Sequence, residues 1–189
     1  MKAAIIGYSG HAFVVLEAAL QANLSISYYC ERSQHLIIPF GLEYLGDENV
    51  STFDWDRIDS FVLCIGDNLI REKVVSRIKA HHKYSLTVQH PQSFVSKTSE
   101  IGLSTFGTPH ATVHTFSSVG KYCILNTGCI VEHECLVGDF VHIAPGAVLA
   151  GNVSVGDGTF IGANTVVKQG VKIGQHVVVG AGSVVLGNI

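Results

Sequence analysis

The sequence predicts a small α/β unit followed by a parallel β-helix, and three observations support this prediction. First, aliphatic residues recur at almost every sixth position from Ile101 to Val185. Second, glycine often follows the repeated residue, and a small or medium-sized residue stands two positions before it. Third, the first part of the chain lacks this period and alternates short apolar runs with turns and helical segments, which is typical of an α/β unit.

A period of six fits neither an α-helix nor a two-sided strand, whose side chains repeat every 3.6 and 2 residues. Three six-residue faces make one coil of about eighteen residues, and equivalent residues then stack from coil to coil about 4.8 Å apart. The columns expected inside the prism are Ile101, Val119, Val137, Val155 and Ile173 on one face and Val113, Val131, Leu149, Val167 and Val185 on another. Parallel connections are normally right-handed, so the period alone does not indicate the hand of the helix.

The elements of the α/β unit follow from its apolar runs and turn residues. In chain order they are a strand at residues 2–6, a Gly-containing turn at 7–11, a helix at 12–20, strands at 26–30 and 61–65, a helix at 69–80 and a last strand at 86–88. Alternation of strand, turn and helix is typical of a parallel, Rossmann-like sheet. Because His90-Pro91 interrupts this pattern, we expect one domain over residues 1–88 and a second over residues 89–189.

Composition excludes several classes of function. The net charge is −3 with only 12 Lys and Arg, and no basic stripe is present, so nucleic acid is not an expected partner. No apolar run approaches the roughly 20 residues of a membrane helix, and the N-terminus does not resemble a signal peptide. The five cysteines form no CxxC pair, and we interpret those within the repeat as small buried residues. A cytoplasmic location is therefore expected.

Three loops are expected at the carboxyl ends of the parallel strands, where α/β units bind ligands. They are residues 7–11, the pair Glu31 and Arg32, and residues 66–68. A glycine turn that leads into a helix N-terminus suits a phosphate group, because its backbone N–H groups are free and the helix dipole favours negative charge. The turn lacks the GxGxxG spacing, which disfavours NAD, and the simpler alternative is that its glycines serve turn geometry alone.

The repeat register predicts where the histidines of the second domain point. His133 and Glu134 fall between the inward residues Val131 and Cys135, so they lie on an outward corner. A histidine beside a carboxylate can be held in one tautomer and made more basic, which is what a general base needs. The alternative is a solvated corner histidine. His142 also points outward, but it lies half a coil away, so the two histidines would meet only across a groove between two prisms.

A metal site is not expected, because the spacing of the histidines does not provide a convincing third ligand. The remaining histidines outside the repeat are interpreted as surface or loop residues: His35, His81, His82 and His90.

Residues 126–147, with the sequence NTGCIVEHECLVGDFVHIAPGA, and the turn GYSGH at residues 7–11 together resemble a known family. It is the sialic acid O-acetyltransferase and UDP-4-amino-sugar N-acetyltransferase family of bacterial glycan biosynthesis. Its members belong to the hexapeptide-repeat acyltransferases, which are left-handed β-helices and typically trimers that use an acyl-CoA. The resemblance covers nearly the whole chain and implies a left-handed β-helix and a homotrimer here.

The resemblance also implies roles for particular residues. His133 would be the general base, and Glu134 would raise its basicity. The residues that would contact acetyl-CoA are His142, Ala163 and Ala181. The sugar nucleotide would be bound by Ser9, Gly10 and His11 at its diphosphate and sugar, and by Glu31 and Arg32 at its nucleoside. Gly66 would lie in the same pocket. Two departures are Ala12, where glycine is usual, and Glu31-Arg32, where a pair of aspartates is common, and the latter leaves base recognition open.

The function expected from this resemblance is N-acetylation of a UDP-4-amino-4,6-dideoxy sugar by acetyl-CoA, with direct attack of the amine on the thioester and no metal. The sequence alone does not separate an amine from a hydroxyl acceptor, so O-acetylation of sialic acid is the first alternative. A non-catalytic scaffold that binds sugar nucleotides is the second, and the intact His133-Glu134 pair argues against it.

Overall fold

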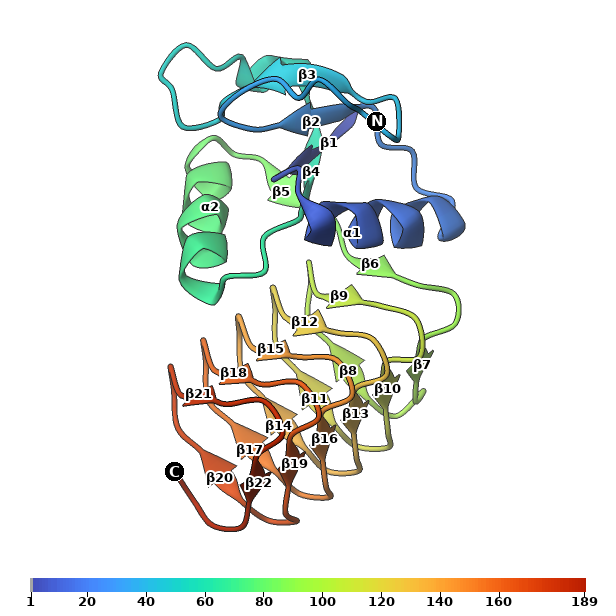
Figure 1. The fold of residues 1–189 in the computed structure, drawn as a ribbon, viewed down its shortest axis with the longest axis vertical. Coiled ribbons are helices and arrows are strands. Elements are labelled where there is room, and N and C mark those ends of the chain that lie inside the picture. Colours follow the sequence, from blue (N-terminus) through green and yellow to red (C-terminus); the bar gives the residue numbers. More distant parts are fainter. Residues whose placement is uncertain (1) are drawn as a thin grey trace. The chain divides into compact units, whose positions relative to one another are not determined.

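The computed structural model describes residues 2–189, and the chain divides into two compact units, Met1–Val88 and Gln89–Ile189 (Figure 1). The first is an α/β unit and the second is a left-handed parallel β-helix, as predicted. None of the helices found in residues 2–189 is both long enough and apolar enough to span a membrane.

The α/β unit is built on a five-stranded parallel sheet in the order β3-β2-β1-β4-β5. Its strands are β1 (Ala3–Ile6), β2 (Tyr28–Cys30), β3 (Glu43–Gly46), β4 (Ser60–Leu63) and β5 (Tyr84–Ser85). Helix α1 (Gly10–Gln21) joins β1 to β2, and α2 (Asn68–Ala80) joins β4 to β5. The strand order reverses between β1 and β4, and such a reversal is where open α/β sheets bind ligands at the carboxyl ends of their strands.

Both helices form for local reasons that the sequence displays. Helix α1 buries Ala12, Val15, Leu16 and Ala19, which share one face because they are three and four residues apart. Helix α2 begins after Asp67, whose carboxylate accepts the N–H of Ile70 at 2.8 Å. The predicted helices and the strands β1, β2 and β4 are therefore confirmed, with shifts of one or two residues at their ends.

Two details of the α/β unit and one of the β-helix differ from the prediction. Strand β3 and the short 3-10 helix η1 (Trp55–Arg57) were not expected. They are only four and three residues long, which is too short for a periodic pattern of apolar residues to be recognised. The prediction of a strand at 86–88 is wrong. The last strand of the sheet, β5, starts two residues earlier, at Tyr84, and Val88 belongs to the first strand of the β-helix. His90, interpreted as a surface or loop residue, follows β6 outside any helix or strand, but it is only 3% exposed and so does not lie at the surface; its Nδ1 accepts the N–H of Gln92 at 3.0 Å.

The β-helix consists of three parallel sheets with two-residue strands (Figure 1). Sheet I contains β6 (Val88–Gln89), β9 (Phe106–Gly107), β12 (Ile124–Leu125), β15 (His142–Ile143), β18 (Phe160–Ile161) and β21 (Val178–Val179). Sheet II contains β7 (Phe94–Val95), β10 (Thr112–Val113), β13 (Ile130–Val131), β16 (Val148–Leu149), β19 (Val166–Val167) and β22 (Val184–Val185). Sheet III contains β8 (Glu100–Ile101), β11 (Ser118–Val119), β14 (Leu136–Val137), β17 (Ser154–Val155) and β20 (Lys172–Ile173).

The aliphatic columns fill the interior of the prism in the predicted register. Val119 pairs with Val137, Val137 with Val155, and Val155 with Ile173. Leu149 and Val131 are completely buried. The repeat begins earlier than expected, because Val95 on β7 already packs against the core.

The small inward position does more than fill space. Ser117 Oγ donates to the carbonyl of Glu132 at 2.6 Å, and Cys135 Sγ donates to that of Ala150 at 3.2 Å. Each bond joins one coil to the next and satisfies a corner carbonyl that the strands leave unpaired. Cys123, whose Sγ donates to the carbonyl of Gly138 at 3.1 Å, and Cys135 are therefore hydrogen-bond donors as well as small buried residues.

Candidate active site

The corner between β13 and β14 presents His133 and Glu134 outside the prism, as the register predicts. Val131 and Cys135 on either side are fully buried, whereas the side chains of His133 and Glu134 are 48% and 62% exposed. Glu134 has a φ of +61°, in the left-handed region, and this sharp corner turns its carboxylate back toward the preceding residue. Nδ1 of His133 lies 3.0 Å from Oε2 of Glu134.

This pair has the geometry of an oriented base. An ionised carboxylate only accepts hydrogen bonds, so Nδ1 of His133 donates to Glu134 and the lone pair lies on Nε2. A neutral imidazole held in this tautomer can accept a proton at Nε2 from a substrate.

The residues expected at the cofactor lie on another side of the prism. His142 is on the outer face of sheet I, where it is only 8% exposed. Its Nε2 lies 3.2 Å from Asn126 Nδ2, and the ring of Phe160 meets it edge-on at 5.0 Å. Ala163 and Ala181 occupy the corner between sheets I and II. One chain therefore does not bring these three residues to His133, because sheet II stands between the two corners.

Two of the β-helix thiols, those of Cys129 and Cys135, are unsuited to act as nucleophiles. Burial raises the pKa of Cys129 to about 12, and burial also raises the pKa of the Cys135 thiol. Both thiols therefore stay protonated near neutral pH, and neither supplies the thiolate that an acyl-enzyme route needs.

A hollow of about 330 Å³ lies at the carboxyl ends of β1 and β2. Its lining includes Gly7, Glu31 and Arg32 from the predicted loops. Gly7 has a φ of +89°, and a Cβ there would lie 3.1 Å from the carbonyl oxygen of Cys64. Glycine is therefore required at this turn for both its backbone conformation and its close approach to β4.

The start of α1 has the character of an anion site. Ser9 is the N-cap residue, yet within the described part of the chain its side chain makes no capping hydrogen bond, and the first turn contains no acidic residue. The N-terminal N–H groups of a helix that no side chain caps are suited to a negatively charged ligand. Gly10 and His11 form the first turn, so the structure places the three predicted residues at one helix end.

Glu31 connects two of the predicted loops. Its carboxylate accepts the N–H of Tyr8 at 3.1 Å and that of Arg32 at 3.0 Å. These bonds hold the loop after β1 against the end of β2, a structural role that the sequence reasoning did not anticipate.

Two other polar residues of the hollow were missed. Glu48 and Asn49 follow β3, the strand that the sequence pattern did not reveal, and both line the hollow. Glu48 is 7% exposed, and its Oε1 lies 3.4 Å from Arg77 Nη1. Burial raises the pKa of the Glu48 carboxyl above its ordinary range.

Arg71 was also missed, although the sequence contained a signal. It is 1% exposed and donates from Nη1 to the carbonyls of Ile65 at 3.1 Å and Gly66 at 3.2 Å. These bonds position the loop after β4. The signal was a charged residue on the apolar face of α2, which it shares with Val74 and Ile78. Burial lowers the pKa of His11, and the charge of Arg71 lowers it further, which favours the neutral imidazole.

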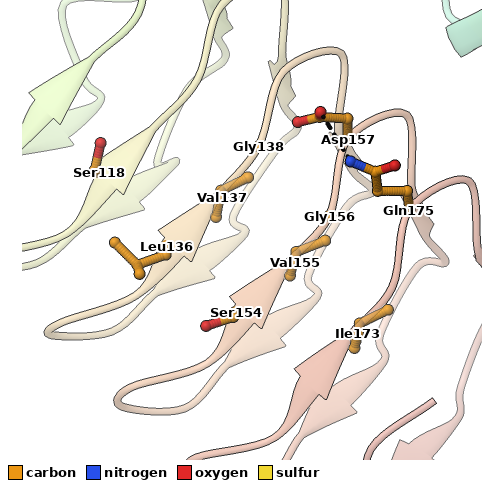
Figure 2. Close-up of a pocket in the computed structure, with 10 residues that line it drawn as sticks. All are labelled: Ser118, Leu136, Val137, Gly138, Ser154, Val155, Gly156, Asp157, Ile173 and Gln175. Carbon is orange, nitrogen blue, oxygen red and sulfur yellow. Dashed lines mark hydrogen bonds between the residues drawn. The ribbon is translucent and has the colours of Figure 1, made fainter.

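A second hollow of about 390 Å³ lies on the outer face of sheet III (Figure 2). Ser118, Leu136 and Ser154 line it, and Gln175 donates to Asp157 at 3.2 Å along its edge. None of the predicted site residues lines it. Within residues 2–189, no three or more His, Cys, Asp or Glu side chains are placed to hold a metal ion.

Comparison with known proteins gives two family matches. Residues 2–78 match the family described as PglD N-terminal domain, and residues 152–187 match the bacterial transferase hexapeptide family. A curated relative, GDP-perosamine N-acetyltransferase from Escherichia coli O157:H7, is 34% identical over 85 residues. That alignment covers 45% of this chain and 38% of the relative.

Solved structures match the whole chain. PerB from Caulobacter crescentus, in complex with CoA and GDP-perosamine, is 29% identical with a TM-score of 0.93, and the match covers 100% of this chain and 90% of that chain. The acetyltransferase domain of PglB from Neisseria gonorrhoeae FA1090 is 30% identical with a TM-score of 0.90, covering 100% and 92%. That PglB domain has also been solved in complex with acetyl coenzyme A, at 29% identity and a TM-score of 0.91, again covering 100% and 92%.

Proposed function

We propose that this chain, which belongs to the family of hexapeptide-repeat sugar acetyltransferases with a PglD-type N-terminal domain, is an acetyl-CoA-dependent N-acetyltransferase. Its acceptor is an amino sugar carried on a nucleoside diphosphate, and its product serves bacterial glycan biosynthesis. The observation that carries the proposal is the exposed pair of His133 Nδ1 and Glu134 Oε2, 3.0 Å apart. The complexes of PerB with CoA and GDP-perosamine and of the PglB domain with acetyl coenzyme A support it.

The pair acts as a general base in a direct transfer. A sugar ammonium first releases one proton to solvent. The neutral amine then attacks the thioester carbonyl, and His133 Nε2 accepts a proton from the nitrogen as the C–N bond forms. The tetrahedral intermediate collapses, the C–S bond breaks, and the CoA thiolate takes the proton back from the imidazolium. Glu134 holds the ring through Nδ1 and stabilises its positive charge in between.

The nucleotide is proposed to bind in the α/β unit. Ser9, Gly10 and His11 meet the diphosphate and sugar at the start of α1, where backbone N–H groups favour an anion. Glu31 and Arg32, which line the hollow, are proposed to lie at the nucleoside end, and Gly66, which follows the lining residue Ile65, is proposed to approach the same ligand.

The base of the nucleotide is proposed to be guanine. Glu48 and Asn49 place a carboxylate and an amide in the hollow beside Glu31. Guanine offers two neighbouring donors, N1–H and the N2 amino group, that a carboxylate can accept together, whereas uracil offers one N–H on its corresponding edge. The GDP-perosamine bound to PerB agrees with this choice. The UDP-linked sugar expected from the sequence remains the alternative.

Acetyl-CoA is proposed to bind between subunits of a homotrimer, with His133 from one subunit and His142, Ala163 and Ala181 from its neighbour. Two corners of one prism do not meet, so a second prism is needed to complete the site. Sheet II offers an outward apolar stripe for such a contact, formed by Ile130, Val148, Val166 and Val184. Three head-to-tail contacts form a closed ring without an open filament. Because it consumes acetyl-CoA, we place the reaction in the cytoplasm.

The proposed function is tested by following CoA thiol release with purified protein. The acceptors are GDP-linked and UDP-linked 4-amino sugars, the same sugars without a nucleotide, and sialic acid, each with and without a zinc chelator. We expect metal-independent transfer to an amino sugar nucleotide, with the GDP form preferred. Transfer to sialic acid alone would indicate an O-acetyltransferase, and tight nucleotide binding without any transfer would indicate a scaffold. Either result overturns the proposal.

The shared site has its own test. Native mass measurement should give a trimer, and mixing inactive His133→Ala and His142→Ala subunits should restore part of the activity. A fully active monomer, or verified mixed trimers without activity, would contradict the shared site.

A further inference from the structure

We propose that Gly151 is a positioning residue for the catalytic base, because its missing side chain leaves the space that the imidazole of His133 occupies. This inference rests on the role of His133 in the proposed function. Gly151 lies in the corner between β16 and β17, one coil after His133. The two corners are in direct register, since the N–H of Asn152 donates to the carbonyl of His133 at 2.8 Å.

The ring of His133 lies over the α-carbon of Gly151. A Cβ added to Gly151 would lie 2.5 Å from Nε2 and 3.1 Å from Nδ1, and it would also collide with Cε1. Real Cβ contacts essentially never fall under 3.0 Å, so an alanine at this position would displace the ring. Gly151 is buried although its corner faces outward, which agrees with a ring that covers it.

The backbone itself does not require glycine at this position. The φ of Gly151 lies outside the left-handed region, which the next residue, Asn152, occupies with a φ of +58°. The equivalent corner position holds Lys97, Thr115 and Gln169 in other coils. A side chain is therefore compatible with this corner wherever no imidazole lies against it.

Two features thus fix the position of the base. The carboxylate of Glu134 holds Nδ1 of His133 from one side, and the missing side chain of Gly151 lets the ring pack directly against the backbone of the next coil. Moving the ring would lengthen the bond from Nδ1 to Glu134 and shift Nε2 from the position where it meets the amine. Because the ring serves proton transfer, its displacement should lower kcat and leave substrate binding intact.

The test is Gly151→Ala, compared with Gly174→Ala as a matched control. We expect Gly151→Ala to lower kcat about 10²-fold, with KM for both substrates and the unfolding midpoint near the wild-type values. Gly174→Ala also adds one methyl group, its φ is not left-handed, and its nearest neighbours lie at 3.6 Å (Ile189 O) and 3.7 Å (Val177 Cγ2). It should keep wild-type kcat.

A double mutant separates positioning from any independent role. If Gly151 acts through the ring, Gly151→Ala has no further effect on kcat in a His133→Ala background. An additional loss in that background, or wild-type kcat for Gly151→Ala while His133→Ala is impaired, overturns this inference and leaves the proposed function in place. Near-normal turnover of His133→Ala alone would instead remove the base assignment, and the positioning role with it.

Discussion

The two units of this protein place their candidate functional side chains by different physical means. In the β-helix, His133 is oriented by coil stacking, since the same corner recurs about every eighteen residues and each coil contacts only its neighbours. In the α/β unit, the loops are held by individual polar bonds between unlike segments, such as those of Arg71 to Gly66 and Glu31 to Tyr8. The β-helix site should therefore depend on continuous packing, and the α/β site on a few specific bonds.

The largest expected effect on stability comes from opening the packed column of the β-helix. Leu149→Ala removes a fully buried side chain and should lower the free energy of unfolding by about 2–5 kcal/mol. Denaturant unfolding measures it. A loss of no more than about 0.5 kcal/mol, as expected for a surface substitution, would show that stacking does not stabilise this unit.

A smaller loss of stability is expected from a substitution in one turn of the α/β unit. Gly7→Ala places a Cβ at a φ of +89° and 3.1 Å from the carbonyl oxygen of Cys64, so it should cost about 1–3 kcal/mol. Gly10→Ala is the control, because a Cβ there meets nothing within 4 Å and its backbone is helical. The control should leave stability unchanged or raise it by about 0.4–1 kcal/mol. Equal losses in both variants would contradict the close-approach argument.

A still smaller loss of stability is expected when one hydrogen bond between coils is removed. Cys135→Ala removes the donor to the carbonyl of Ala150 and should cost about 0.5–1.5 kcal/mol. Cys135→Ser keeps a donor like that of Ser117 in the previous coil, so it should lose less. The comparison is by thermal and denaturant unfolding. If serine were the worse replacement, the thiol would matter as an apolar group rather than as a donor.

The smallest effect is a change in pH dependence within the α/β unit. Burial raises the pKa of Glu48, so between its ordinary pKa of about 4.5 and the raised value the folded state binds more protons than the unfolded state. The free energy of unfolding therefore falls as pH rises through this window. Glu48→Gln should abolish that fall, which unfolding measured across the window would detect. If the free energy of unfolding had the same pH dependence in the variant and the wild type, the raised pKa of Glu48 would be contradicted.

The comparison also explains what the sequence could predict. The interior columns and the outward corner of His133 were predictable because one period governs every coil, so register follows from counting. Glu48 could not be found, because β3 is four residues long, was itself not predicted, and is placed by pairing with β2 rather than by local propensity. The role proposed for Gly151 could not be predicted either, since it depends on the space next to the α-carbon and appears only once His133 is placed.

Turnover of His133→Ala tests most directly the claim that this corner histidine is the base for acetyl transfer to a sugar amine. The account predicts a fall in kcat of about 10²–10⁴-fold with the free energy of unfolding unchanged. His176→Ala, which removes another exposed corner histidine, should keep wild-type kcat. A folded His133→Ala protein with near-normal transfer from acetyl-CoA to the amino sugar nucleotide would contradict the account.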